Sequence, residues 1–193
     1  NETTTLTFPF ENSTIYVYYR RYEGISGANL ITLRFAAPAE GIWVLNLYNN
    51  RDESGDVDVW IMNRSLIGDN VFFLTPDVYT TITDPGNLAS GITVNAYDYR
   101  DNSIYGDNGR GNNWYGILKP DFAAPGVDIT VPSYTAVNRY ENRSGTSIAA
   151  GFYAGMAGLL LEYGIVRGNI PYISTNEIRN ITIDGCEQSQ GII

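Results

Sequence analysis

The sequence has 193 residues, of which 44% are hydrophobic and 17% are charged, and its formal net charge is -9. This length suits one domain, or one domain and part of another, and the apolar content is sufficient to bury a core. The negative charge, without any basic run, argues against binding to nucleic acid or to anionic membranes. No uninterrupted apolar run approaches the ~18 residues of a membrane span. The chain contains no histidine, which excludes any mechanism in which this chain alone supplies an imidazole base.

Residues 1 to about 82 carry the pattern of short antiparallel strands. Apolar and polar side chains alternate with a period of two in five segments, and turn residues separate the segments. The predicted strands cover residues 3–10, 14–19, 30–35, 42–48 and 57–62. Several short strands at this spacing predict a β-sandwich or a barrel.

An acidic cluster surrounds one of the predicted turns and contains Asp52, Glu53, Asp56 and Asp58. We expect a solvated acidic loop at this position. The alternative is a calcium site, because Ca²⁺ prefers oxygen ligands in loops of this kind. We predict no metal site elsewhere in the chain.

A turn sequence, Asp-Pro-Gly-Asn, follows residue 82 and marks a predicted domain boundary. The pattern after it is that of an α/β domain. Residues 92–97 predict a short strand of a parallel sheet. Residues 144–163 predict a buried helix, because their many glycines and alanines allow close approach to neighbouring elements. A last helix is predicted at residues 175–181, where Ser174 and Glu177 form a capping box.

Ser147 lies in the first turn of the predicted 144–163 helix, directly after Gly145 and Thr146. Free backbone N–H groups and the positive end of the helix dipole surround such a position. These groups can stabilise an oxyanion on an attacked carbonyl, so the site suits a nucleophile. The alternative is that Gly-Thr-Ser is only a plain helix N-cap.

A second segment, KPDFAAPGVDI at residues 119–129, changes the balance between these interpretations. The order KPDxxAPGVxI and then SGTSxAA resembles the subtilase family, the subtilisin-like serine proteases, over about residues 83–184. By this resemblance Ser147 is the nucleophile, its own backbone N–H is one oxyanion donor, and Gly145 and Thr146 shape the turn before it. The sequence departs from many members at residues 151–152, where Gly-Phe replaces Pro-His, and neither position belongs to the catalytic triad.

The β-rich front and its direct connection to a subtilase C-terminal half are similar to the clostridial Csp germination proteases. Those subtilases carry a jelly-roll domain inserted in the catalytic domain. The fold implied is a jelly-roll-like β-sandwich portion at residues 1–82, followed by the C-terminal part of a subtilisin-like α/β domain at residues 83–193. The resemblance also implies a protein or peptide substrate, which in Csp relatives is the zymogen of a cortex-degrading enzyme, and a spore, cell-envelope or secreted location.

A serine hydroxyl needs a base, usually an imidazole, and a carboxylate that orients the base. In subtilases Asp and His precede Ser along the chain, and the resemblance places both before Asn1, together with an Asn of the oxyanion hole. We therefore expect the isolated chain to be inactive, and the parent protein to hydrolyse peptide bonds through an acyl-enzyme on Ser147. We also expect dimerisation, domain swapping, rearrangement or an N-terminal or pro-segment to compensate for the missing strands.

Two alternatives stay open. The first is a non-catalytic pseudoprotease or interaction scaffold of the same family, in which Ser147 is only a cap. The second is a carbohydrate-binding β-sandwich, which leaves residues 119–163 unexplained. Among the other polar side chains, we predict structural roles for Lys119, Asp121 and Asp128 rather than roles as a base or an acid–base pair. Cys186 is predicted to be an incidental free thiol.

Overall fold

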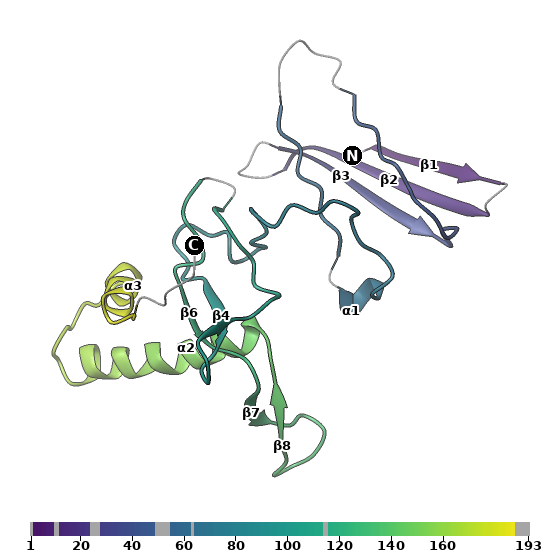
Figure 1. Ribbon diagram of the computed structural model, residues 1–193. Helices are drawn as coiled ribbons and strands as arrows, with labels where there is room; N and C mark the ends of the chain where they lie inside the picture. The colour runs from purple at the N-terminus through teal and green to yellow at the C-terminus, as the bar shows by residue number, and fades with distance from the viewer. Residues whose placement is uncertain are drawn as a thin grey trace. The chain divides into compact units, whose positions relative to one another are not determined.

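The computed structural model describes residues 2–9, 12–23, 28–48, 55–62, 64–113 and 116–187. These residues form two compact units, Asn1–Ile61 and Met62–Ile193, and each unit is described by itself (Figure 1). The sequence predicted domains at residues 1–82 and 83–193 from a family resemblance. The compact units are defined by contacts instead, so the predicted division stays a prediction.

The first unit contains one antiparallel sheet of three strands in the order β1-β2-β3. The strands are β1 (Glu2–Phe8), β2 (Ser13–Glu23) and β3 (Ala28–Ala36). The register aligns Leu6, Ile15 and Phe35 in one row across the sheet. Because side chains alternate between the two faces of a strand, this row belongs to one apolar face. Three of the predicted strands are therefore confirmed.

The predicted strands at residues 42–48 and 57–62 are wrong, because both described segments lack regular secondary structure. Trp43 packs edge-to-face against Phe8 and Phe35, with ring centroids 5.6 and 5.4 Å apart. An alternating pattern forms a strand only where a neighbouring strand pairs with it, and the described part of this unit offers none to these segments. The unit thus shows one sheet, and a two-sheet sandwich is not confirmed.

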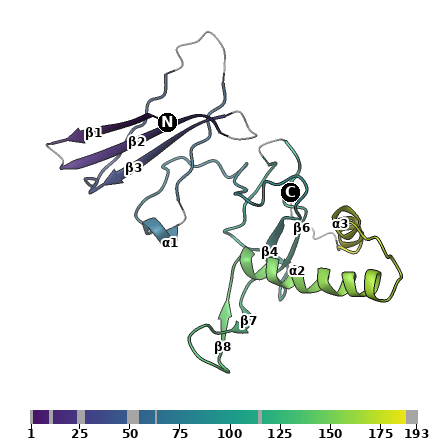
Figure 2. The ribbon, with the colours of Figure 1, turned by 180° about the vertical axis from the view of Figure 1, so that it is seen from behind.

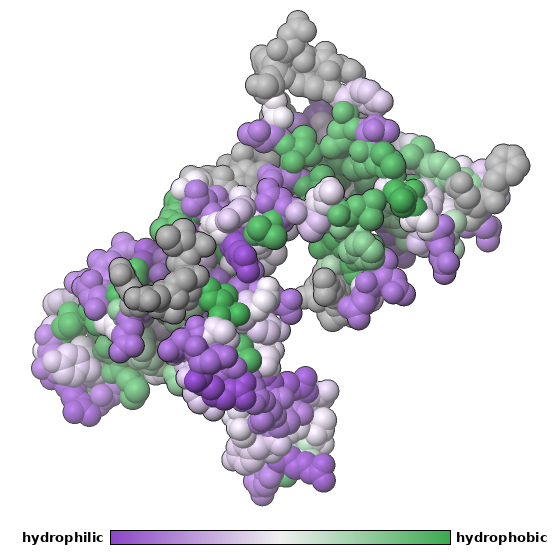
Figure 3. Space-filling view, viewed as in Figure 1, coloured by the Kyte–Doolittle hydropathy of each residue, from purple (hydrophilic) through white to green (hydrophobic). Residues whose placement is uncertain are grey.

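The apolar face of this sheet is largely uncovered among the described residues. Ile15 is buried, whereas Leu6, Ile31 and Phe35 are each more than one third exposed. Figure 3 shows hydrophobic residues gathered over the part of the first unit that holds the sheet. An apolar face of this size is typical of a surface that another element covers.

The second unit is built around a small mixed sheet with the strand order β5-β4-β6. Its central strand, β4 (Val94–Asp98), pairs in parallel with β6 (Phe122–Pro125) and antiparallel with the short β5 (Ser103–Ile104). A hairpin of β7 (Ile129–Pro132) and β8 (Tyr140–Arg143) follows β6. The helical elements are α1 (Arg64–Ile67), α2 (Thr146–Leu161), η1 (Glu162–Val166, a π-helix) and α3 (Thr175–Asp184).

The core of the second unit lies between the sheet and the helices α2 and α3. It contains Val94, Ala96, Ala124, Ala149, Tyr153 and Ile178. Figure 2 shows α2 beside β4 and β6, as does Figure 1. The strand predicted at residues 92–97 is confirmed as β4, which begins at Val94, and the helix predicted at residues 175–181 is confirmed as α3, which extends to Asp184. The capping box of Ser174 and Glu177 is present.

The expectation that α2 is a buried helix is wrong for most of its surface. Only Ala149 and Tyr153 of this helix are buried. A Cβ atom added at Gly151, Gly155 or Gly158 would meet no atom within 4 Å. The small residues were expected to permit close packing, but the three-stranded sheet reaches only one face of the helix. The face that carries these glycines is therefore open among the described residues.

The continuous helical stretch Thr146–Val166 is long and apolar enough, by length and composition only, to cross a membrane. Core helices of globular domains satisfy the same criteria, and one side of α2 does pack on the sheet. The sequence expectation that the chain has no membrane span stays a prediction.

A buried charge network fixes the amino ends of β4 and β6. The carboxylate of Asp121 accepts hydrogen bonds from Lys119 Nζ at 2.6 Å and from the Thr93 amide at 2.7 Å. Arg179 Nε of α3 lies 3.1 Å from the same carboxylate. Lys119 and Arg179 also both donate to the Gly91 carbonyl at 2.7 Å. Two cations thus share one carboxylate and one carbonyl, and the contact joins both strands to α3.

We predict that Asp121→Asn lowers the free energy of unfolding by about 3–5 kcal/mol, because it leaves the ammonium of Lys119, whose side chain is 1% exposed, without its counter-ion. Urea unfolding measures this change. The matched control is Glu141→Gln, which breaks the more exposed Glu141–Arg143 pair and should cost less than about 1 kcal/mol. Equal effects of the two substitutions would contradict the structural role of the network.

Candidate functional site

The helix α2 begins at the carboxyl ends of the parallel strands β4 and β6. The register runs from Val94↔Phe122 to Tyr97↔Pro125, so both strands end at the same edge of the sheet. The Gly126 amide continues the ladder with a hydrogen bond of 3.0 Å to the Tyr97 carbonyl. In open α/β sheets, ligands bind outside the carboxyl ends of the strands, and Ser147 in the first turn of α2 lies at this edge.

Two glycines bring the end of β6 into backbone contact with the start of α2. The Gly145 amide donates to the Gly126 carbonyl at 2.8 Å. A Cβ atom at Gly126 would lie 2.7 Å from Ala96 Cβ and 3.0 Å from Ala149 Cβ, which is too close. Gly145 has a φ of 148°, a backbone conformation that favours glycine. Both positions therefore need a residue without a side chain.

Ser147 is the second residue of α2, and it is exposed. The N-cap residue of the helix is Gly145, and no side chain makes a capping hydrogen bond. The alternative that this serine is a plain N-cap is therefore wrong. Within the described ranges the Ser147 hydroxyl has no hydrogen-bond partner, so a hydroxyl and the amino end of a helix are accessible at one place.

A polar network surrounds the same edge of the sheet. Arg100 Nε and Nη2 donate to the Asp98 carboxylate at 2.8 and 2.6 Å, and Arg100 Nη1 donates to Asp128 at 2.8 Å. Hydrogen bonds from the Arg100 side chain and amide lower the pKa of Asp98 from its ordinary value of 3.8 to about 2. The sequence did not predict the role of Arg100, because its partners are two and 28 residues away and no spacing rule links them.

The structure separates the carboxylates that flank the Pro-Gly turn. Asp121 lies at the amino end of β6 with Lys119, whereas Asp128 follows the carboxyl end of β6 and pairs with Arg100. Because the two carboxylates lie at opposite ends of β6, they cannot act as an acid–base pair. This agrees with the structural roles predicted for them. Lys119 is bound to Asp121 at the end of the sheet opposite to Ser147, so it is not placed to act as a base.

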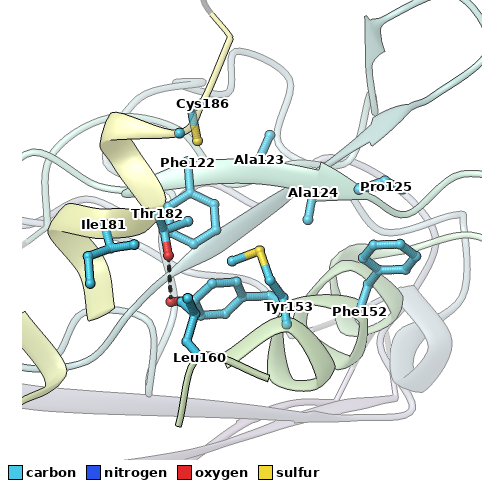
Figure 4. A pocket seen from close by; sticks show the side chains of 12 residues that line it. Phe122, Ala123, Ala124, Pro125, Phe152, Tyr153, Leu160, Ile181, Thr182 and Cys186 are labelled. Atoms are coloured by element: carbon cyan, nitrogen blue, oxygen red, sulfur yellow. Dashed lines mark hydrogen bonds between the residues drawn. The ribbon is translucent and has the colours of Figure 1, made fainter. Parts of the chain in front are cut away.

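An apolar pocket of about 280 Å³ lies between β6, α2 and α3. Figure 4 shows Phe122, Phe152, Tyr153 and Cys186 among the side chains around it, and Ser147 is not one of its lining residues. Burial raises the pKa of the Cys186 thiol and thus disfavours the thiolate. Cys186 itself is exposed, and its incidental role stays a prediction. Because Ser147 does not line the pocket, the pocket is separate from the predicted nucleophile.

The described residues contain no group of three or more His, Cys, Asp or Glu side chains arranged to hold a metal. Asp52 and Glu53 of the acidic cluster lie outside the described residues. The expectation of an acidic loop, with calcium as the alternative, therefore stays a prediction.

A parallel strand pair, a helix that starts at its carboxyl edge and an accessible serine in the first helical turn define part of an α/β domain. The family model described as the subtilase family matches residues 68–190, more than half of the chain. The chain belongs to the subtilase family.

Known proteins that are similar to this chain include a curated protease and a protease of solved structure. Serine protease AprX of Bacillus subtilis is 29% identical over 126 residues, which are 56% of this chain and 27% of AprX. The solved structure of the Clostridium perfringens CspB protease matches with a TM-score of 0.69 and 24% identity, over 94% of this chain and 39% of that chain. The predicted similarity to a Csp-type subtilase is thus confirmed for the fold. The chain spans well under half the length of both relatives.

We predict that Gly126→Ala destabilises the protein by about 1–3 kcal/mol, because the added methyl group overlaps the packed alanines of β4 and α2. Thermal or urea unfolding measures the loss. Gly151→Ala is the matched control when both variants are made in the isolated chain, since its Cβ there enters open space within a helix and should stabilise by about 1 kcal/mol. A neutral Gly126→Ala variant would show that the glycine contact does not limit the turn.

The depressed pKa of Asp98 predicts an acid-dependent loss of stability. Above the ordinary value of 3.8 the pairing with Arg100 stabilises the folded state, and this contribution is lost as the pH falls through 3.8 toward about 2. Melting temperatures between pH 6 and pH 2 should therefore fall less steeply for Asp98→Asn than for the unsubstituted protein. Parallel curves for the two proteins would contradict this assignment.

Proposed function

We propose that this chain supplies the nucleophile half of a subtilisin-like serine endopeptidase, with Ser147 as the nucleophile. The observation that carries the proposal is the accessible Ser147 hydroxyl in an uncapped first helical turn, at the carboxyl edge of β4 and β6. Membership of the subtilase family supports peptide-bond hydrolysis as the reaction class.

The proposed reaction has two stages. Ser147 Oγ attacks the peptide carbonyl carbon while a base takes its proton, and the backbone N–H of Ser147 binds the oxyanion that forms. The C–N bond then breaks, the base returns the proton to the leaving amine, and an acyl-enzyme remains. Water attacks the acyl group with help from the same base, which restores the free hydroxyl. Gly145 and Thr146 shape the turn that presents the nucleophile.

The base must come from outside this chain, since the chain has no histidine. In the proposed arrangement, the remaining part of the catalytic domain supplies Asp, His and a second oxyanion donor. The open face of α2 around Gly151, Gly155 and Gly158 supports this arrangement, because it offers a close-packing surface that the described residues leave uncovered. The isolated chain is inactive in this proposal.

The β1–β3 sheet is, in this proposal, one layer of a jelly-roll-like domain. The uncovered apolar face that carries Leu6, Ile31 and Phe35 supports a second layer. The proposal extends to a protein or peptide substrate and to a spore, cell-envelope or secreted location. It also extends to the partner that covers the chain, which is an N-terminal or pro-segment, a second copy or a domain swap. These last assignments rest on the Csp-type resemblance.

The second candidate function is a non-catalytic scaffold of the same family. It is favoured by the missing histidine and by the absence of any side-chain base bonded to the Ser147 hydroxyl in the part of the chain that the structure describes. The two candidates differ in whether Ser147 is activated in the complete protein.

We expect a fluorophosphonate probe to label the complete protein that contains this chain, and Ser147→Ala to abolish the labelling. Peptide hydrolysis by this variant should fall by about 10⁶-fold, as for loss of the nucleophile in subtilisin. Ser133→Ala, which changes a half-buried serine in the β7–β8 loop, is the control and should label normally. Failure of the folded complete protein to label would favour the scaffold, and labelling of the isolated chain would contradict the external base.

A further inference from the structure

Arg100 connects the end of β4 to the segment that follows β6. Its Nε and Nη2 atoms form a fork on the Asp98 carboxylate, and its Nη1 atom reaches Asp128 Oδ2 at 2.8 Å. Charge-assisted contacts with a planar guanidinium fix orientation as well as distance. One side chain thus sets the position of Asp128 relative to the sheet.

Asp128 in turn holds the segment before α2. Its amide donates to Ser144 Oγ at 2.9 Å, and its Oδ1 atom accepts from Asn142 Nδ2 of β8 at 3.0 Å. Two residues earlier, the Gly126 carbonyl accepts from the Gly145 amide at 2.8 Å. Residues 126–128 therefore form hydrogen bonds to Ser144 and Gly145, which lie three and two residues before Ser147.

The conformation of Asp128 depends on these contacts. Its φ is 54°, in the left-handed region that non-glycine residues adopt uncommonly, although Asp adopts it more readily than most. Arg100 and Asn142 hold one carboxylate oxygen each. Without the guanidinium, one of the two side-chain contacts that fix this conformation is lost, and the amide that binds Ser144 Oγ can turn away.

The Arg100–Asp128 contact contributes to position more than to stability. The Arg100 side chain is 50% exposed and that of Asp128 is 43% exposed, so water screens their attraction and its effect on unfolding is small. Catalysis is far more sensitive to geometry, because a misplacement of about 1 Å can cost about 100-fold in rate.

We propose that Arg100 is a positioning residue, which holds Asp128 and through it the Ser144–Gly145 turn, and so sets the place of the Ser147 hydroxyl and of the first N–H groups of α2. This inference rests on the proposed function of Ser147. Arg100 acts through Asp128 and is not itself expected to touch the substrate.

The test compares Arg100→Gln with Arg167→Gln in the complete protein. Arg167 is the matched control, since it also forms an exposed ion pair, with Glu162, but follows the far end of α2. We expect Arg100→Gln to slow fluorophosphonate labelling and lower kcat by about 10- to 100-fold, with KM nearly unchanged. Both are measured well below the melting temperature, which falls because the pairing with Asp98 is lost as well. Arg167→Gln should behave as the unsubstituted protein. Equal labelling rates for both variants would overturn the proposal.

Asp128→Asn provides a second, independent variant. Asp128→Asn acts through the same contact as Arg100→Gln. The double variant Arg100→Gln/Asp128→Asn should therefore label about as slowly as the slower single variant, rather than showing the product of the two effects. Multiplicative effects would show that Arg100 does not act through Asp128 and would overturn the proposal.

Amide hydrogen exchange over residues 141–150 gives a readout that does not depend on catalysis. We expect faster exchange at Gly145 and its neighbours in Arg100→Gln, and no change in Arg167→Gln. If the unsubstituted protein is not labelled at all, the proposed protease function fails. Exchange then decides this inference by itself: faster exchange only in Arg100→Gln supports the holding role, and unchanged exchange overturns it.

Discussion

The backbone contact between Gly126 and Gly145 determines where the second unit places its exposed serine. The hydrogen bond of 2.8 Å and the lack of space for a Cβ atom at Gly126 bring the end of β6 against the start of α2. The two sequence motifs, KPDxxAPGVxI and SGTSxAA, are therefore the two sides of one contact. A helix that begins there must direct its free N–H groups to the carboxyl edge of the sheet, which is where Ser147 lies.

The two ends of the β4–β6 pair carry ion networks that differ in burial. At the amino end, Lys119, Asp121 and Arg179 are largely buried and join the strands to α3. At the carboxyl end, Arg100 and Asp128 are about half exposed and connect the end of β4 with the loop that follows β6. A buried ion network resists displacement because an unpaired buried charge is costly. In the proposed function, the more exposed network therefore positions the turn before Ser147 on a frame that is already fixed.

Local patterns predicted the elements that local physics decides. The period of two marked β1, β2 and β3, and the capping box marked α3, since each signal lies within a few adjacent residues. The strands expected at residues 42–48 and 57–62 failed, because a strand needs a partner that no local pattern supplies. The exposure of α2 was missed for the same reason: small residues permit close packing but do not provide the neighbour. Arg100 joins residues distant in sequence, and only the fold brings them together.

In the proposed function, the open face of α2 connects assembly with activity. An apolar helix whose glycines meet no neighbour has unused capacity for close packing, and burial of apolar surface is the main favourable term in association. The same addition must bring the imidazole that the chain lacks. The element that covers α2 and the element that activates Ser147 are thus parts of one structure, so a hydroxyl on an incompletely assembled domain stays unreactive. The turn that Arg100 and Asp128 hold would then be preformed, and completion of the domain would add the base without rearranging the nucleophile.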